Sequence, residues 1–425
     1  MNLHRENTHQ NRNARTRKYL QQDFSPILEQ VMPDEYKKIP QSEIEGRIIR
    51  LKNDLKLGNL DGALILTTPD LYYYSGYGGD GAIFVPTDDE PTHLIKRNLP
   101  LAKFYSRLAN IKPYGRQSKL IETLDINPNS SIAIEADVLP FSFVSFLQKQ
   151  AKDIQFIDGS KLLRKIRAVK STFEIKLIEK AAEIVDQSFE VCKELANPDM
   201  TEIELASQLD AWMLKNDHSG YITTRSLNNI MPVYSFVISS SSATLNTFFT
   251  PVSAGGLSPK YPYGPSTRKL GRNEPFLVDT CGNKLGYISD TTRTFVCGHF
   301  DSETQSQLEA LVQIKQFLKK RLRPLENLGQ LYTEVLELVK ELGTHEYFMG
   351  TSSDHVPFLG HGVGLELDDL PIFYSKGPDL EVGNVIACEP KIIKPKQLVL
   401  GIEDTYAISE SGNMLLSKAP DYIEI

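Results

Sequence analysis

The sequence predicts a two-domain protein of the mixed α/β (α+β) class, and three observations lead to this prediction. The chain has 425 residues, more than a single compact core usually holds. In its first part, short apolar runs alternate with helical patterns, which is typical of α/β units. In its second part, long amphipathic helices are followed by paired β-prone runs. We place the boundary near residue 168, which gives domains 1–167 and 168–425.

The first domain is expected to contain a sheet flanked by helices. The runs GALILTT, GAIFVP and SIAIEAD are short, apolar and bounded by turn residues, so each predicts a buried strand. Helices are predicted at residues 41–57 and near 98–108, 117–125 and 140–150. No group of catalytic side chains stands out in this domain, so the chemistry is expected in the second one.

The second domain is expected to open with two helices. The run SKLLRKIRAVKSTFEIKLIEKAAEIVDQSFEVCKEL has apolar residues three and four apart after a cap candidate at Ser171 and Thr172. In the next helix, Thr201 and Glu204 have the spacing of a capping box. Two more helices are predicted near 301–322 and 327–342, among β segments.

The composition argues against two classes of partner, nucleic acids and membranes. The formal net charge of -7 argues against a nucleic-acid partner, because phosphate binding requires a basic surface. No run is long and apolar enough to suggest a membrane span. The four cysteines do not form CxxC pairs, and the start of the chain lacks the apolar segment of a secretory signal, so we expect a cytoplasmic protein. We interpret the polar residues at about 1–20 as a flexible arm, with contact to a partner subunit as the alternative.

The run FLVDTCGNKLGYISDTTRTFVCG contains two β-prone segments around the turn-like GNKLG, which predicts a hairpin. If the hairpin closes between Lys284 and Leu285, Asp279 faces Asp290 across the ladder, with Cβ atoms about 5 Å apart. Two carboxylates in this position repel each other unless a cation lies between them. A divalent metal ion is the simplest such cation.

A second hairpin of the same kind is predicted in VIACEPKIIKPKQLVLGIEDTYAI, where a turn centred on Lys396 would place Glu389 opposite Glu403. Between the two hairpins, His361 lies in the glycine-rich run FLGHGVGL, where a backbone can approach a site closely. Four carboxylates and one imidazole suit two divalent ions, with manganese preferred and cobalt, zinc or iron as alternatives. Two such ions could activate a water molecule for attack on an amide.

Six motifs of the second domain together carry a resemblance to a known family: RAVKSTFEIKLIEKAAEIVD, VDTCG, SDTTRTF, GHGVGL, CEP and GIEDT. The domain resembles the pita-bread metallopeptidases, a family that includes methionine aminopeptidase, aminopeptidase P, prolidase and creatinase. The N-terminal part, including DLYYYSGY, is similar to the creatinase-type N-terminal domain. The resemblance implies a creatinase-type domain followed by a pita-bread catalytic domain, and a homodimer. It also implies five metal ligands: Asp279, Asp290, His361, Glu389 and Glu403. Glu389 would in addition accept the proton of the attacking water.

Three positions depart from the family pattern. Asp368 stands seven residues after His361, where the family usually carries a second His. The segment from Tyr261 to Tyr263 stands where another His usually precedes the first Asp ligand. Gly401 stands two residues before the last Glu, where many prolyl-specific members carry an Arg. The two missing His residues contact substrate in the family, so the substrate is the open question.

Other side chains could replace the missing groups. His355, six residues before His361, could supply an imidazole, or it could be structural. Asp368 could act as an acid or base, or it could bind a cationic group of the substrate. Tyr261 or Tyr263 could donate a hydrogen bond to a developing oxyanion.

Three functions therefore remain open. The first is a metal-dependent hydrolase of small peptides or amides, of the Xaa-Pro aminopeptidase or dipeptidase kind. The second is an enzyme of the same fold that acts on a non-peptide substrate, as a creatinase-like C–N hydrolase or a lyase. The third is a binding protein that has kept the fold and lost catalysis.

Overall fold

The computed structural model divides the chain into two units, Met1–Ile166 and Arg167–Ile425. The residues that the structure describes are 25–31, 39–124, 126–225, 231, 234–239, 255–350, 355–394 and 396–425. The arm expected at about 1–20 lies outside these residues. Among the described residues, no helix has the length and apolar character needed to cross a membrane.

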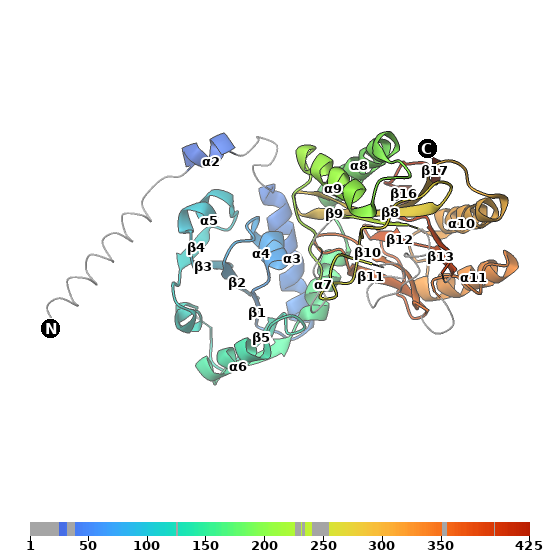
Figure 1. Cartoon of the computed structure of the whole chain (residues 1–425). Coiled ribbons are helices and arrows are strands. Elements are labelled where there is room, and N and C mark those ends of the chain that lie inside the picture. Colours follow the sequence, from blue (N-terminus) through green and yellow to red (C-terminus); the bar gives the residue numbers. More distant parts are fainter. Residues whose placement is uncertain are drawn as a thin grey trace. The chain divides into compact units, whose positions relative to one another are not determined.

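The N-terminal unit contains one mixed sheet of six strands in the order β4-β3-β2-β1-β5-β6 (Figure 1). The strands are β1 Gly62–Ile65, β2 Gly81–Pro86, β3 Thr92–Ile95, β4 Asn110–Pro113, β5 Ser131–Ile134 and β6 Gln155–Asp158. Strand β2 is antiparallel to both of its neighbours, whereas β5 is parallel to both of its own. The central strands bury apolar side chains such as Leu64 and Ile132, which explains why their sequences read as apolar runs.

The helices of this unit include the predicted ones, with one correction, and two that were not predicted, Ser25–Val31 and Thr68–Ser75. In chain order, the helices are α2 Ser25–Val31, α3 Gln41–Leu57, α4 Thr68–Ser75, α5 Leu99–Tyr105, η2 Gln117–Lys119, η3 Ile121–Thr123 and α6 Phe141–Gln150, and α7 Ser160–Ala168 follows β6. The predicted helix at 41–57 is confirmed. The continuous helix predicted near 117–125 is wrong, because the structure forms two short 3₁₀ turns there. The segment lies between the left-handed Gly115 and the Pro128 region, which leaves too few residues for a stable α-helix.

His93 is a buried polar residue of this unit. Its side chain is 0% exposed, and Nδ1 lies 3.0 Å from Ser106 Oγ. Burial lowers the pKa of His93 from 6.5 to about 4. Because the unfolded chain binds this proton more readily, the stabilisation is present above pH 6.5 and is lost as the pH falls toward 4. We expect the free energy of unfolding of this unit to fall by on the order of 3 kcal/mol over that interval.

Calorimetric unfolding of wild-type protein and of His93→Gln across this pH range would measure the effect. The variant should lose most of the dependence on pH below 6.5, because it has no imidazole to protonate. His345 is exposed, so His345→Gln is the matched control and should behave like wild type. An identical pH dependence in His93→Gln and wild type would contradict the assignment.

The second unit contains a four-stranded sheet, β17-β9-β8-β7, a five-stranded sheet, β11-β10-β12-β15-β16, and the two-stranded ribbon β13-β14. Its strands are β7 Ser235–Ser239, β8 Pro275–Lys284, β9 Tyr287–Val296, β10 Phe358–Gly362, β11 Asp369–Tyr374, β12 Val385–Cys388, β13 Lys391–Lys394, β14 Leu398–Gly401, β15 Asp404–Ser409, β16 Gly412–Leu415 and β17 Tyr422–Glu424. Its helices are α8 Thr172–Leu195, α9 Glu202–Lys215, α10 Ser302–Arg321 and α11 Leu328–Glu341.

The helices cover the strands in two pairs (Figure 1). Helix α8 packs on β8 and β9, and α9 packs on β7. Helices α10 and α11 pack on each other, with contacts to β14 and β11. Both predicted caps are confirmed: Ser171 with Glu174 opens α8, and Thr201 with Glu204 opens α9, each as a complete capping box.

The first predicted hairpin is present as β8 and β9, but its register differs from the prediction. Lys284 pairs with Tyr287, so the turn consists of Leu285 and Gly286, and both have positive φ. A two-residue turn of this kind suits the right-handed twist of the strands. As a result, Asp279 lies opposite Thr292 and not opposite Asp290. The shift is two positions, so the two carboxylates remain on the same face of the sheet.

The second predicted hairpin is present as β13 and β14, in the predicted register. Lys391 pairs with Gly401, and Lys394 pairs with Leu398. Glu389 precedes the ribbon by two residues and Glu403 follows it by two residues, so the same register directs both Glu residues to one end. Their backbones are held on different strands, because Glu389 N donates to Leu359 O and Glu403 N donates to Thr292 O.

Candidate metal centre

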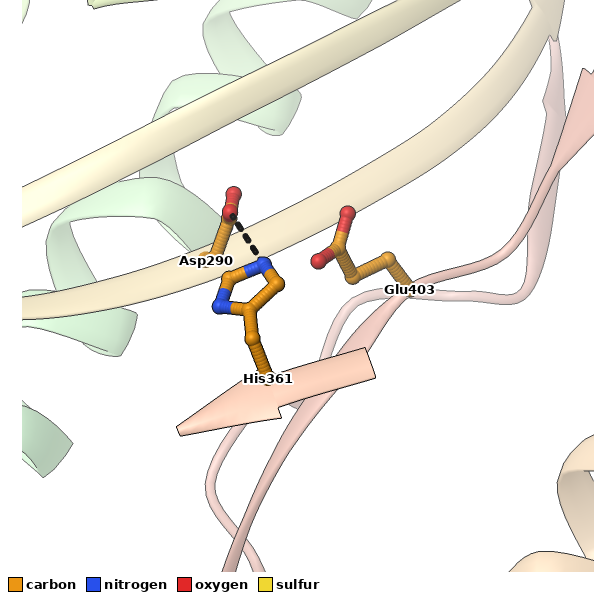
Figure 2. Close-up of side chains that lie close together, drawn as sticks. All are labelled: Asp290, His361 and Glu403. Carbon is orange, nitrogen blue, oxygen red and sulfur yellow. Dashed lines mark ion pairs between the residues drawn. The ribbon is translucent and has the colours of Figure 1, made fainter. Parts of the chain in front are cut away.

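Three side chains from three different segments meet between the sheets of the second unit. Asp290 comes from β9, His361 from β10, and Glu403 from the residues between β14 and β15. Figure 2 shows their polar ends turned toward one another. One potential ligand atom from each lies within 4.8 Å of the other two, and Asp290 Oδ2 is 3.8 Å from His361 Nε2. This spacing is small enough for all three to reach a single ion.

The hydrogen bond of His361 determines which ring nitrogen faces the carboxylates. Nδ1 lies 3.2 Å from the carbonyl oxygen of Gly362, which can only accept, so Nδ1 carries the proton. In the neutral imidazole, Nε2 then presents a lone pair toward Asp290. A lone pair facing carboxylate oxygens is favourable when a cation lies between them.

Glu389 and Asp279 border this trio. Glu389 Oε1 lies 3.7 Å from His361 Nε2, so the Glu389 carboxylate extends the group on the β12 side. Asp279 is only partly buried and approaches from β8. Glu403 is held by Thr292, whose Oγ1 donates to Glu403 Oε2 at 2.7 Å. The structure therefore brings all five residues of the expected ligand set into one region.

Burial and mutual repulsion act on these carboxyl groups. Burial, with repulsion from Asp279, raises the pKa of Asp290 to about 7. Burial and the charge of Asp290 also raise the pKa of Glu403 well above its usual range. Burial raises the pKa of Asp279 as well, although Lys391 opposes that shift. All three shifts disfavour negative charge in the metal-free cluster, and a bound cation would reverse them.

Glu403 provides a direct test of whether these residues fit a metal ion. Its Oε2 accepts from Thr292, whereas its buried Oε1 has no hydrogen-bond partner among the residues that the structure describes. A buried carboxylate oxygen without a partner is costly, and a metal ion would satisfy it. Oxygen donors combined with one imidazole suit divalent ions of the manganese, cobalt, iron or zinc kind. The residues present fit such an ion.

Sequence reasoning missed Lys391, which lies at the centre of the carboxylates. Its Nζ donates to Glu389 Oε2 at 2.5 Å and lies 3.4 Å from Asp279 Oδ2 and 3.6 Å from Glu403 Oε2. Burial alone would lower the pKa of this ammonium, but Glu389, Asp279 and Glu403 together raise it well above its ordinary value. The available signal was the alternation of the strand, which places Lys391 on the same face as Glu389, two residues earlier.

Asp368 lies in the turn between β10 and β11, where it anchors a neighbouring segment. Its Oδ1 accepts a hydrogen bond from the backbone N–H of Arg225 at 2.8 Å. The Arg225 guanidinium lies 3.3 Å from Glu366, and Arg167 also pairs with Glu366, so this turn belongs to a buried ion cluster. Asp368 is thus held in place, as a residue that orients a substrate would need to be.

The remaining residues singled out from the sequence lie outside the ligand trio. The rings of Tyr261 and Tyr263 are in edge-to-face contact, with centroids 4.9 Å apart. Burial, with Tyr263 nearby, raises the pKa of Tyr261 to about 12, so its hydroxyl remains a hydrogen-bond donor at neutral pH. His355 is exposed and precedes β10. The structure does not bring His355 into the trio of Asp290, His361 and Glu403.

Comparisons with known families cover both units. Residues 176–410 match the family model described as metallopeptidase family M24. Residues 47–169 match the model described as the creatinase/prolidase N-terminal domain. The five proposed ligands all lie within the first of these matches.

Individual relatives resemble the chain over most of its length. The Xaa-Pro dipeptidase of Pyrococcus horikoshii is 26% identical over 379 residues, which cover 85% of this chain and 93% of that protein. The Xaa-Pro dipeptidase of Pyrococcus furiosus is also 26% identical and covers 88% of this chain and 98% of its own length. Among solved structures, the prolidase from Pyrococcus horikoshii OT3 has a TM-score of 0.74 at 24% identity, covering 88% of this chain and 99% of that one. The Xaa-Pro dipeptidase from Bacillus anthracis has a TM-score of 0.75 at 22% identity, covering 90% and 100%. The predicted order, a creatinase-type domain followed by a pita-bread domain, is confirmed.

Proposed function

The chain belongs to metallopeptidase family M24, and from this premise we propose that it cleaves the Xaa-Pro bond of dipeptides or short peptides. The observation that carries the proposal is the convergence of buried Asp290 and Glu403 with half-buried His361, and with Glu389 beside them. The names of the relatives favour an Xaa-Pro dipeptidase over an Xaa-Pro aminopeptidase. Family membership implies a divalent metal, and we propose two ions per chain, with manganese preferred over cobalt, zinc or iron.

Bound at this centre, the divalent metal would activate water and polarise the carbonyl oxygen of the scissile bond. Glu389 is the proposed proton acceptor for that water. Lys391 contacts Oε2 of Glu389, which leaves Oε1 on the side of His361 and available for a proton. The contact between His361 Nδ1 and the Gly362 carbonyl oxygen orients the ring so that Nε2 is directed toward Asp290.

Substrate recognition is proposed to involve the residues that stand in place of the family's histidines. Asp368 offers a carboxylate that would attract the cationic amino group of a short peptide, and Arg225 holds it in position. The hydroxyl of Tyr261 or Tyr263 is proposed to donate to the oxygen that becomes negative in the transition state. His355 remains a further candidate for a catalytic imidazole.

The decisive experiment combines metal analysis with a substrate panel. Purified protein would be stripped of metal, analysed for metal content, and reconstituted with Mn²⁺, Co²⁺ or Zn²⁺. It would then be assayed on Xaa-Pro dipeptides, on longer Xaa-Pro peptides and on matched Xaa-Ala peptides. We expect about two ions per chain and cleavage of Xaa-Pro dipeptides that stops when metal is removed. Equal cleavage of Xaa-Pro and Xaa-Ala would contradict prolyl specificity.

A second function is motivated by the departures at Asp368, Tyr261 and Tyr263. A carboxylate and phenols in place of the family's imidazoles would suit a non-peptide substrate, as for a creatinase-like C–N hydrolase or a lyase. Metal binding without any peptide cleavage would favour this function. A protein that binds neither metal nor peptide would instead be a non-catalytic homologue.

We further propose that the protein is a cytoplasmic homodimer. Dimerisation is an expectation from the family resemblance, and light scattering on the purified protein would measure it. A reducing compartment agrees with the cysteines, since Cys192, Cys281, Cys297 and Cys388 are all free and buried.

A further inference from the structure

Lys391 is buried in the candidate metal centre, and no established role accounts for it. The residue is 0% exposed, on the first position of β13. Its ammonium lies within 3.6 Å of carboxylate oxygens from Glu389, Asp279 and Glu403. These three residues come from three separate segments of the chain. A single lysine therefore links most of the proposed ligand set.

Gly401 provides the space for this lysine. It is the cross-strand partner of Lys391 in the β13-β14 ribbon. A Cβ atom built at Gly401 would lie 3.0 Å from Lys391 Cγ and 3.5 Å from Lys391 Cε, and 3.3 Å from Thr292 Cγ2. The first of these distances is shorter than ordinary van der Waals contact, so a side chain at 401 and the present path of the lysine compete for the same space. In this cross-strand pair, β13 therefore carries a long cationic side chain and β14 carries no side chain.

The Lys391 ammonium has two opposite electrostatic effects in this centre. The carboxylates crowded into this centre repel one another in the metal-free protein, and the ammonium of Lys391 reduces that repulsion. The same ammonium repels an incoming divalent ion across a few ångströms of poorly solvated interior. Removing the positive charge should therefore affect metal-free stability and metal affinity in opposite directions.

We propose that Lys391 is a built-in counter-charge of the metal centre, a positioning residue that stabilises the metal-free carboxylates and thereby limits the affinity for metal. The inference rests on the proposed metal site. It assigns to Gly401 the role of admitting the lysine, so that the cation reaches the carboxylates from β13 at a position where β14 carries no side chain.

Titration of the full-length, metal-stripped protein with Mn²⁺ tests the inference by calorimetry. We expect Lys391→Met to bind Mn²⁺ at least about tenfold more tightly than wild type, with a lower melting temperature when metal-free. A variant that was merely damaged would bind metal more weakly or not at all. An unchanged or higher dissociation constant in Lys391→Met would overturn the inference. If wild type itself bound no Mn²⁺, the proposed function would fail instead.

Two further variants separate charge from packing. Lys391→Arg keeps the positive charge, so its Mn²⁺ dissociation constant should stay within about threefold of wild type. The double variant Lys391→Gly with Gly401→Arg moves the cation to the opposite strand of the same cross-strand pair. It should return the dissociation constant toward the wild-type value, while Lys391→Gly alone should bind as tightly as Lys391→Met. Tight binding in Lys391→Arg, equal to that of Lys391→Met, would overturn the counter-charge role. Should Lys391→Met fail to fold without metal, Lys391→Gln carries the same test.

Discussion

Replacing Glu389 by Gln is expected to lower kcat for Xaa-Pro dipeptides by about 10²- to 10⁴-fold. The amide has nearly the same shape as the carboxylate but cannot take a proton from water. In addition, an amide nitrogen directed at Lys391 would place two donors together, where Nζ and Oε2 are now 2.5 Å apart. The loss should therefore appear in kcat at saturating metal and should not be recovered by raising the substrate concentration.

Steady-state kinetics at saturating Mn²⁺ would measure this loss, with circular dichroism to verify the fold. Glu410 is exposed on the turn between β15 and β16, so Glu410→Gln is a matched control that should retain wild-type activity. A Glu389→Gln enzyme with full activity would remove Glu389 from the role of proton acceptor.

Replacing Arg293 by Met is expected to lower the free energy of unfolding by about 3 to 5 kcal/mol. The side chain of Arg293 is 0% exposed, and its guanidinium lies 2.6 Å from Asp404 Oδ1. It also donates to the backbone carbonyls of Thr292 at 2.9 Å and Glu403 at 2.6 Å. Arg293 also donates to the carbonyls of Ala419 and Pro420, so Met, which fills similar volume, leaves a buried carboxylate and four carbonyls without this donor.

Urea unfolding of the second unit in metal-stripped protein would measure the change. Arg323 provides the control, because its side chain is 64% exposed in its pair with Glu326. Arg323→Met should lose less than about 1 kcal/mol. Similar losses in the two variants would mean that the Arg293 guanidinium does not hold the backbone beside Glu403. Because Thr292 also binds the Glu403 carboxylate, we expect weaker Mn²⁺ binding to accompany the loss of stability.

The register of the second hairpin could be predicted from the sequence, whereas the register of the first hairpin could not. In the second, the turn around Lys396 is bounded by clear apolar strands, so the register followed from the pattern. In the first, GNKLG offers two glycines and several possible centres. The turn forms where two successive residues, Leu285 and Gly286, adopt positive φ, which a leucine gives no reason to expect. Period-two alternation nevertheless kept Asp279 and Asp290 on one face, so the site was predicted despite the wrong register.

The role proposed for Lys391 does not follow from the sequence, because it depends on distances between separate segments of the chain. The sequence shows a lysine in a strand, which is usually a solvated side chain. Its burial follows from the packing of β14, the partner of β13, on β8 and β9, and from the absence of a side chain at Gly401. The ion cluster of Arg167, Glu366 and Arg225 is similar, since its two ion pairs join residues 199 and 141 positions apart in the chain. Such long-range pairs follow only from the assembled fold.

The pairing of β17 with β9 has a consequence for biosynthesis. Tyr422–Glu424 run parallel to Thr294–Val296, and Ser417 Oγ lies 3.1 Å from Thr291 Oγ1. These partners of β9 follow Glu403 in the chain, and segments emerge from the ribosome in order. A nascent polypeptide that has already exposed all five proposed metal ligands therefore still lacks the strand that flanks β9. We therefore expect peptidase activity to appear only late in translation. Truncated chains that end before β17 should lack this activity even when they contain all five proposed metal ligands.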